Sequence, residues 1–107
     1  MKQHADCFFP HVIVDADGRI AAAGTLFLEN KFIRSCGRVG HIEDIVVSSQ
    51  HRGKNLGRFL LQKLVELARS KGAYKIILDC EAEKVQFYEK CGFVEKGRQM
   101  ALYFNEQ

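Results

Sequence analysis

The segment Arg52-Gly53-Lys54-Asn55-Leu56-Gly57-Arg58 combines glycines with basic side chains directly before a helical pattern. Main-chain N–H groups in the first turn of a helix have no partner within the helix, and the helix dipole favours an anion there. Gly53 lets a ligand approach the backbone, and Arg52, Lys54 and Arg58 add positive charge. The segment therefore predicts a cradle for a phosphate group, with a plain glycine turn as the alternative.

Three carboxylates and one phenol are further residues whose side chains are capable of acid–base chemistry. Glu43 and Asp44 fall inside a segment of strand composition, which is unusual because strands disfavour Asp and buried carboxylates need partners. Asp79 ends a later apolar segment, where helix capping is the alternative role. Tyr88 follows on a short helical segment, and a phenol, with an ordinary pKa of about 10, can donate a proton or a hydrogen bond.

The elements that position these residues follow from the periodicity of the chain. The expected strands lie at 12–14, 20–29, 40–47, 74–80, from Phe93 onward and at 99–104. The expected helices run from Leu56 to a stop at Gly72 and over 83–90. A helix-length interval before the strand at 74–80 predicts a crossover between parallel strands. The fold class is therefore α/β (α+β), with a mixed central sheet flanked by helices.

Several segments resemble those of the GCN5-related N-acetyltransferases, the GNAT superfamily. Arg52-x-x-Asn55-x-Gly57 is similar to its pyrophosphate-binding turn, with Asn55 where glycine is commonest, and 86–93 resembles its Phe-Tyr-x-x-x-Gly-Phe signature. The match is closer to the glucosamine 6-phosphate N-acetyltransferase branch, on the segments 40–47, 74–80 and 87–93. It implies a GNAT-like acyl-CoA N-acyltransferase fold, N-terminally shortened, since the family's usual first strand and helices have no counterpart before Val12.

The resemblance also implies an activity and the residues that carry it. Acetyl would pass from acetyl-CoA to the amine of D-glucosamine 6-phosphate by direct attack in a ternary complex, without a metal. The implied catalytic residues are Glu43, Asp79 and Tyr88. The implied coenzyme-binding residues are Ile45, Val46, Val47, Arg52, Gly53, Lys54, Asn55, Leu56, Gly57, Arg58, Tyr88, Glu89 and Lys90. The implied acceptor-binding residues are Lys31, Arg34, Glu43, Asp44, Lys75 and Asp79.

The strand carrying Ile45 would splay from its neighbour, and the Ile45 N–H would polarise the thioester carbonyl. Tyr88 would protonate the departing sulfur. Tyr103 stands where this branch usually has a phosphate-binding Arg, commonly lent across a dimer interface. The resemblance therefore favours a homodimer. His41 is expected to be a hydrogen-bonded strand residue rather than a base.

Composition bounds these expectations. The 107 residues predict a single N-acetyltransferase domain over 1–107, and a net charge of +3 suits a phosphorylated ligand but not a nucleic-acid partner. No secretory or membrane-spanning stretch is present, so a cytoplasmic protein without a membrane partner is expected. The four cysteines have no metal or redox spacing, which predicts reduced structural thiols and no metal site.

Two other functions stay open. One is a GNAT acetyltransferase for another small amine or a protein N-terminus, which Tyr103 and the missing first elements favour. The other is a non-catalytic acetyl-CoA-binding dimerisation module, which the presence of Tyr88 and Glu43 disfavours.

Overall fold

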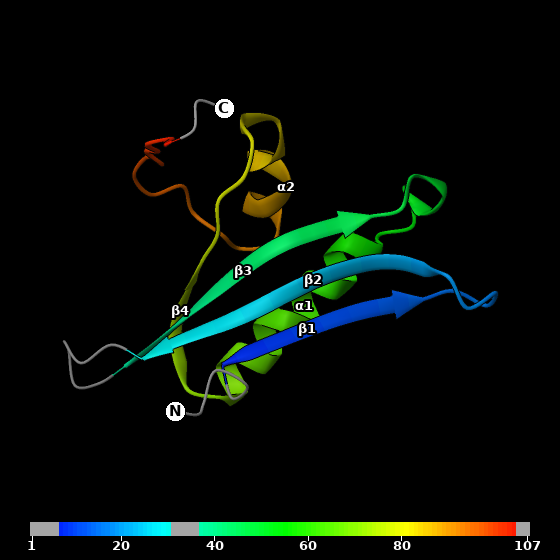
Figure 1. The fold of residues 1–107 in the computed structure, drawn as a ribbon, viewed down its shortest axis with the longest axis horizontal. Helices are drawn as coiled ribbons and strands as arrows, with labels where there is room; N and C mark the ends of the chain where they lie inside the picture. The colour runs from blue at the N-terminus through cyan, green and yellow to red at the C-terminus, as the bar shows by residue number, and fades with distance from the viewer. Residues whose placement is uncertain (1–6, 31–36, 105–107) are drawn as a thin grey trace.

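The structure is a computed structural model and describes residues 7–30 and 37–104. Within these residues one sheet has the strand order β1-β2-β3-β4 (Figure 1). The strands are β1 (Phe8–Val14), β2 (Ile20–Asn30), β3 (Arg38–Val47) and β4 (Ala73–Ile77). The helices are α1 (Leu56–Ser70) and α2 (Val85–Lys90), each preceded by a short 3-10 turn, at Ser49–His51 and Ala82–Lys84.

The sheet is mixed, as expected. β1, β2 and β3 are antiparallel neighbours, and β4 runs parallel to β3 after the crossover through α1. The hairpin between β1 and β2 turns at Gly18, which has a φ of 81°, a conformation that glycine adopts without steric cost. Gly72, with φ 90°, follows the last turn of α1. The expected hairpin, crossover and helix stop are therefore confirmed.

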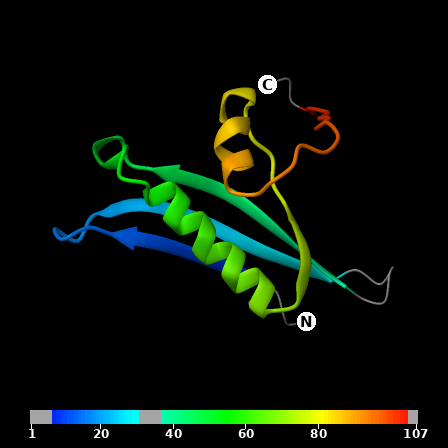
Figure 2. The ribbon, with the colours of Figure 1, turned by 180° about the vertical axis from the view of Figure 1, so that it is seen from behind.

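The hydrophobic core lies between one face of the sheet and α1, which crosses that face (Figure 2). Its buried side chains are Ala22, Leu26, Leu28, Ile42, Leu60, Leu61, Leu64 and Ala68. Burying one leucine side chain contributes about 1.5–3 kcal/mol, so these contacts hold β3 and the start of α1 together. Neither described helix has the length and apolar character that a membrane crossing requires.

Two expected strands, one opening at Phe93 and one at 99–104, do not form in the described C-terminal segment, so this prediction was wrong. A strand requires a neighbouring backbone to accept and donate its hydrogen bonds. The segment instead stands off β4 across a cavity of about 1170 Å³, and Met100 and Phe104 are 91% and 87% exposed. The segment forms no ladder with the outer edge of β4, and that edge is therefore unpaired within the described residues.

Candidate active site

β3 carries one extra residue opposite Gly24 of β2. Ala23 pairs with Val46 while Thr25 pairs with Glu43, so two steps along β2 match three steps along β3. Asp44 takes up the extra step in the left-handed conformation, with φ 59°. Asp is one of the few residues other than glycine that adopt this conformation readily. The strand therefore contains a β-bulge, which bends it at the pair of acidic residues.

The bulge decides which side chains of β3 face the core. Side chains alternate along an unbroken strand, so with Ile42 inward Ile45 would point outward. The extra residue returns Ile45 to the inner face, where its Cδ1 lies 2.5 Å from the position that a Cβ on Gly24 would occupy. Gly24 thus provides the room that the bulged strand needs.

β3 and β4 separate beyond the bulge. Their pairing begins at Arg38 with Ala73 and ends at His41 with Ile77, although β3 continues to Val47. Within the described residues, the last part of β3 has no ladder partner on the β4 side, and Figure 1 shows the chain after β4 turning away toward α2. Backbone groups on that side of Ile45 and its neighbours are available to an extended ligand.

The loop between β3 and α1 lies at the end of this gap. The Ser48 N–H donates to the Ala21 carbonyl (2.8 Å), and the His51 N–H donates to the Ser48 carbonyl (2.9 Å). Beyond His51 the chain takes two left-handed steps, at Gly53 (φ 85°) and Asn55 (φ 61°), before α1 begins. The first N–H groups of α1 have no partner within the helix, and the loop residues directly before them are exposed, as an anion site requires.

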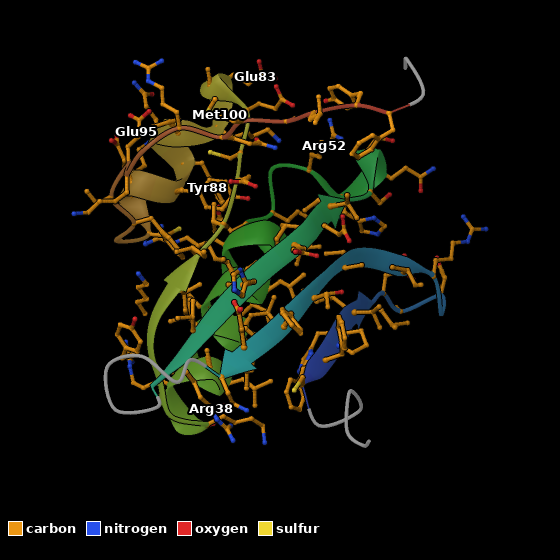
Figure 3. The ribbon with its side chains drawn as sticks, turned by 60° about the vertical axis from the view of Figure 1, so that its left-hand side comes forward. Arg38, Arg52, Glu83, Tyr88, Glu95 and Met100 are labelled. Carbon is orange, nitrogen blue, oxygen red and sulfur yellow. The ribbon has the colours of Figure 1, made fainter. Side chains whose placement is uncertain are left out.

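The basic side chains of the loop are exposed, and Figure 3 places Arg52 beyond the end of β3, with Arg38 at its start. A Cβ on Gly57 would lie 3.4 Å from Val47 Cγ2 and 3.9 Å from Phe87 Cζ. The start of α1, the end of β3 and α2 therefore meet at Gly57, where a larger residue would crowd the contact.

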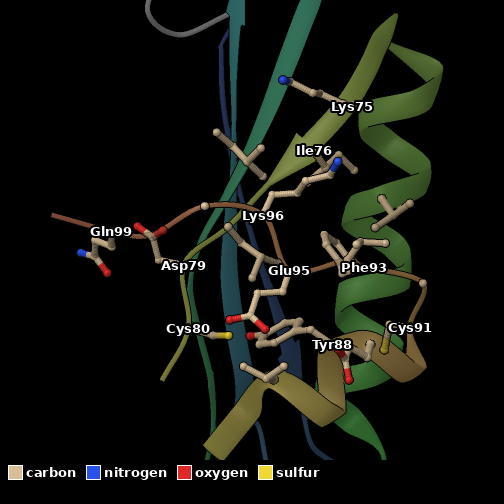
Figure 4. A pocket seen from close by; sticks show the side chains of 18 of the residues that line it. Lys75, Ile76, Asp79, Cys80, Tyr88, Cys91, Phe93, Glu95, Lys96 and Gln99 are labelled. Carbon is tan, nitrogen blue, oxygen red and sulfur yellow. The ribbon is translucent and has the colours of Figure 1, made fainter. Parts of the chain in front are cut away.

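Tyr88 is half-buried between two aromatic rings. Its ring contacts Phe87 and Phe93 edge-on, with centroids 5.0 Å and 5.9 Å apart. Burial raises the pKa of the phenol above 10.0, and the negative charge that Cys80 and Cys91 can carry raises that pKa further. Figure 4 shows the phenol directed toward Cys80. The side chain is thus held between two rings, and the phenol keeps its proton at neutral pH.

The cavity beside Tyr88 brings only some of the expected residues together. Tyr88, Asp79, Lys75 and Glu89 line it, with Lys75 at the opposite end from Tyr88 (Figure 4). Glu43 and Asp44 are exposed on β3, outside the cavity lining.

Two expected phosphate contacts, Lys31 and Arg34, lie outside the described residues. The Nε2–H of His41 donates a hydrogen bond to Glu29 Oε1 (2.9 Å), as expected of a structural strand histidine. The sequence analysis missed the role of Gly24 and a contact between His51 and Asp15. The small residues at 21–24 and the three-residue interval from Ile42 to Ile45 were signals of a bulge. No local pattern marks the His51 contact, because its partner is 36 residues away.

Comparison with known proteins agrees with this geometry. A model of the acetyltransferase (GNAT) family matches residues 1–93. Glucosamine 6-phosphate N-acetyltransferase 1 of Oryza sativa subsp. japonica is 57% identical over 89 residues, which cover 83% of this chain and 54% of the rice protein. Glucosamine 6-phosphate N-acetyltransferase of Schizosaccharomyces pombe is 39% identical over 103 residues, covering 95% of this chain and 93% of that protein.

The crystal structure of glucosamine-6-phosphate N-acetyltransferase from Arabidopsis thaliana superposes with a TM-score of 0.90 at 48% identity, over 94% of this chain and 69% of that one. The chain thus spans little more than half of the rice protein and about two thirds of the Arabidopsis one. The splayed strands, the glycine loop and the matching family model agree along the described chain, and the chain therefore belongs to the GNAT acetyltransferase family.

Proposed function

We propose that this chain transfers the acetyl group of acetyl-CoA to the amine of D-glucosamine 6-phosphate, giving N-acetyl-D-glucosamine 6-phosphate and CoA. The observation that carries the proposal is the gap between β3 and β4, with the bulge at Asp44 on one side and the glycine loop at its end. The names of the rice, fission yeast and Arabidopsis relatives support glucosamine 6-phosphate as the acceptor.

Acetyl-CoA suits the chemistry of this gap. Its extended pantetheine arm carries amides that can pair with the backbone of Ile45, Val46 and Val47, as an added strand would. Its pyrophosphate matches the N–H groups from Gly53 to Gly57 and the charges of Arg52, Lys54 and Arg58. Bound there, acetyl-CoA supplies the acetyl group as a thioester next to the acidic residues of β3. Leu56, Glu89 and Lys90 complete the proposed coenzyme contacts.

Tyr88 is the proposed general acid. Its raised pKa keeps the phenol protonated at neutral pH, so the hydroxyl can deliver a proton to the sulfur as the carbon–sulfur bond breaks. The Ile45 N–H stabilises the negative charge that develops on the carbonyl oxygen. Cys80 and Cys91 are free thiols near Tyr88, but direct attack by the amine requires no thiol nucleophile.

The acidic residues are the proposed amine site. Glu43, Asp44 and Asp79 attract the ammonium group, and a carboxylate or a water that it holds accepts the proton before the nitrogen attacks. Lys75 offers a cation for the sugar phosphate, although its ammonium group also lies 5.7 Å from the Tyr74 ring. The same role for Lys31 and Arg34 is supported by the resemblance alone.

We further propose that the protein works as a homodimer. Leu102, Tyr103 and Phe104 are 77%, 71% and 87% exposed, and the outer edge of β4 is unpaired among the described residues. An exposed apolar segment and an open strand edge both favour pairing with another chain. A second copy would cover these side chains and bring its own segment to the acceptor site. Light scattering coupled to size-exclusion chromatography tests this, and a monomer at micromolar concentration would refute it.

Release of free CoA from acetyl-CoA tests the reaction. A panel of glucosamine 6-phosphate, glucosamine, a polyamine and an N-terminal peptide separates the acceptors. We expect glucosamine 6-phosphate to be turned over with the highest kcat/KM. If only a different amine is turned over, glucosamine 6-phosphate is rejected as the acceptor and that amine takes its place. Tight acetyl-CoA binding with no turnover of any amine would indicate a non-catalytic binding module.

A further inference from the structure

The tip of the β1–β2 hairpin contacts the loop that precedes α1. The Nε2–H of His51 donates to Asp15 Oδ2 at 3.0 Å, joining residues 36 positions apart. Figures 1 and 2 show the hairpin tip and the loop at the same end of the molecule. The contact therefore links the first strand pair to the segment that enters the glycine loop.

Asp15 is a fixed anchor. Its Oδ1 accepts the N–H groups of Asp17 (2.8 Å) and Arg19 (3.0 Å), and its own N–H donates to the Arg19 carbonyl (2.8 Å). The Arg19 N–H contributes most to holding the pKa of this carboxyl below its ordinary value, and His51 adds to the effect. Asp15 is thus a carboxylate at neutral pH, with its second oxygen directed at His51.

His51 is largely shielded from solvent and lies directly before an exposed loop. Its side chain is only 14% exposed, whereas Arg52, Gly53, Lys54 and Asn55 are all exposed. Its Nδ1 is buried and has no hydrogen-bond partner among the described residues, so we assign the ring proton to Nε2. A single side-chain hydrogen bond therefore sets the orientation of the ring.

We propose that the His51–Asp15 hydrogen bond holds the loop at 52–57 in the conformation that receives the coenzyme pyrophosphate, which makes His51 a positioning residue. The loop that follows contains Gly53 and Asn55 in the left-handed conformation, and because glycine can adopt many other conformations, the shape of the loop depends on a fixed starting point. This inference rests on the proposed binding of acetyl-CoA at that loop. If the fraction of molecules with a competent loop falls to about a tenth, the apparent Kd rises about tenfold.

The test compares His51→Phe, which keeps a planar ring but removes the donor, with Asp15→Asn, which keeps a side-chain oxygen for the turn but offers no second carboxylate oxygen to His51. His11→Phe is the matched control, because His11 forms one hydrogen bond through its ring, to the Phe9 carbonyl (3.1 Å), on β1. Calorimetry measures CoA affinity, and hydrogen–deuterium exchange without ligand measures the opening of the peptide at 48–58. Steady-state assays compare acetyl-CoA with S-acetylpantetheine, which lacks the pyrophosphate.

We expect both variants to bind CoA roughly 5- to 20-fold more weakly and to exchange faster at 48–58, with the control unchanged. KM for acetyl-CoA should rise, while kcat and the KM for S-acetylpantetheine stay within about twofold. Unchanged CoA affinity and exchange in both variants would overturn the positioning role alone. Loss of activity with both acetyl-CoA and S-acetylpantetheine, or faster exchange throughout the sheet, would show that the contact supports the whole fold. Either result would also overturn the positioning role. Absence of CoA binding by the unmodified protein would instead overturn the proposed function on which it rests.

Discussion

Replacing Gly24 by alanine tests whether the β3 bulge needs an empty position opposite it. The new Cβ would lie 2.5 Å from Ile45 Cδ1 and 3.3 Å from both Leu60 Cδ2 and Leu64 Cδ1. Overpacking of this kind costs about 1–3 kcal/mol. The lower entropy of the unfolded alanine chain returns about 0.4–1 kcal/mol, because Gly24 does not have a positive φ. The net loss is then on the order of 1–2 kcal/mol, or about 4–16 °C in Tm.

Thermal unfolding followed by circular dichroism measures this loss, and a second substitution isolates its cause. Ile45→Val removes the atom that the new methyl would meet, and alone should cost about 0.5–1.5 kcal/mol. In the double variant the two costs should fall short of their sum by at least about 0.5 kcal/mol. Gly40→Ala is the graded control, since its closest neighbours would be 3.3 Å away. Additive costs, or a Tm unchanged by Gly24→Ala, would show that the bulge does not depend on the missing side chain.

Three further predictions concern Tyr88, the glycine loop and Asp15. Tyr88→Phe should lower kcat about 100-fold with CoA affinity unchanged in calorimetry, and equal turnover would exclude the phenol as the acid. Since the pKa of Tyr88 is raised above 10.0, its deprotonation should not reduce the rate below that pH. Gly53→Val should weaken CoA binding more than Gly72→Val, a control with a similar φ at the other end of α1. Equal CoA affinities in the two variants would show that the loop is a plain turn without a role in binding. Because folding lowers the pKa of Asp15, its carboxylate stabilises the fold above about pH 4 and loses that effect as pH falls. The Tm difference between the unmodified protein and Asp15→Asn should therefore shrink in acid, and a constant difference would contradict this.

The sequence predicted the elements whose signals are local. The period of α1, the turn before Gly18 and the glycine after α1 each depend on neighbouring residues, and the structure confirms all three. The placement of Tyr88 on a short helix followed by Gly92 is confirmed in the same way. Local propensity and stop residues are sufficient where an element is stabilised mainly by its own hydrogen bonds and one apolar face.

The features that the sequence did not predict depend on distant partners. The strands expected at Phe93 and at 99–104 have suitable composition, but a strand exists only beside another strand, and no neighbouring edge accepts them among the described residues. The room at Gly24 is set by Ile45, which is 21 positions away along the chain. The anchor of His51 is a turn formed much earlier. Composition records none of these pairings.

Asp44 has a consequence for how easily the binding gap could be gained or lost. Because it is an additional residue in β3, deletion of Asp44 alone would leave Ile42, Ile45 and Val47 alternating inward as before. Such a chain would keep its core and its antiparallel ladder. Without the bend, however, β3 could continue straight beside β4, and the backbone groups that are free in the gap would then pair with β4 instead of a ligand. A folded protein that no longer takes up coenzyme would then be separated from the competent one by a single codon.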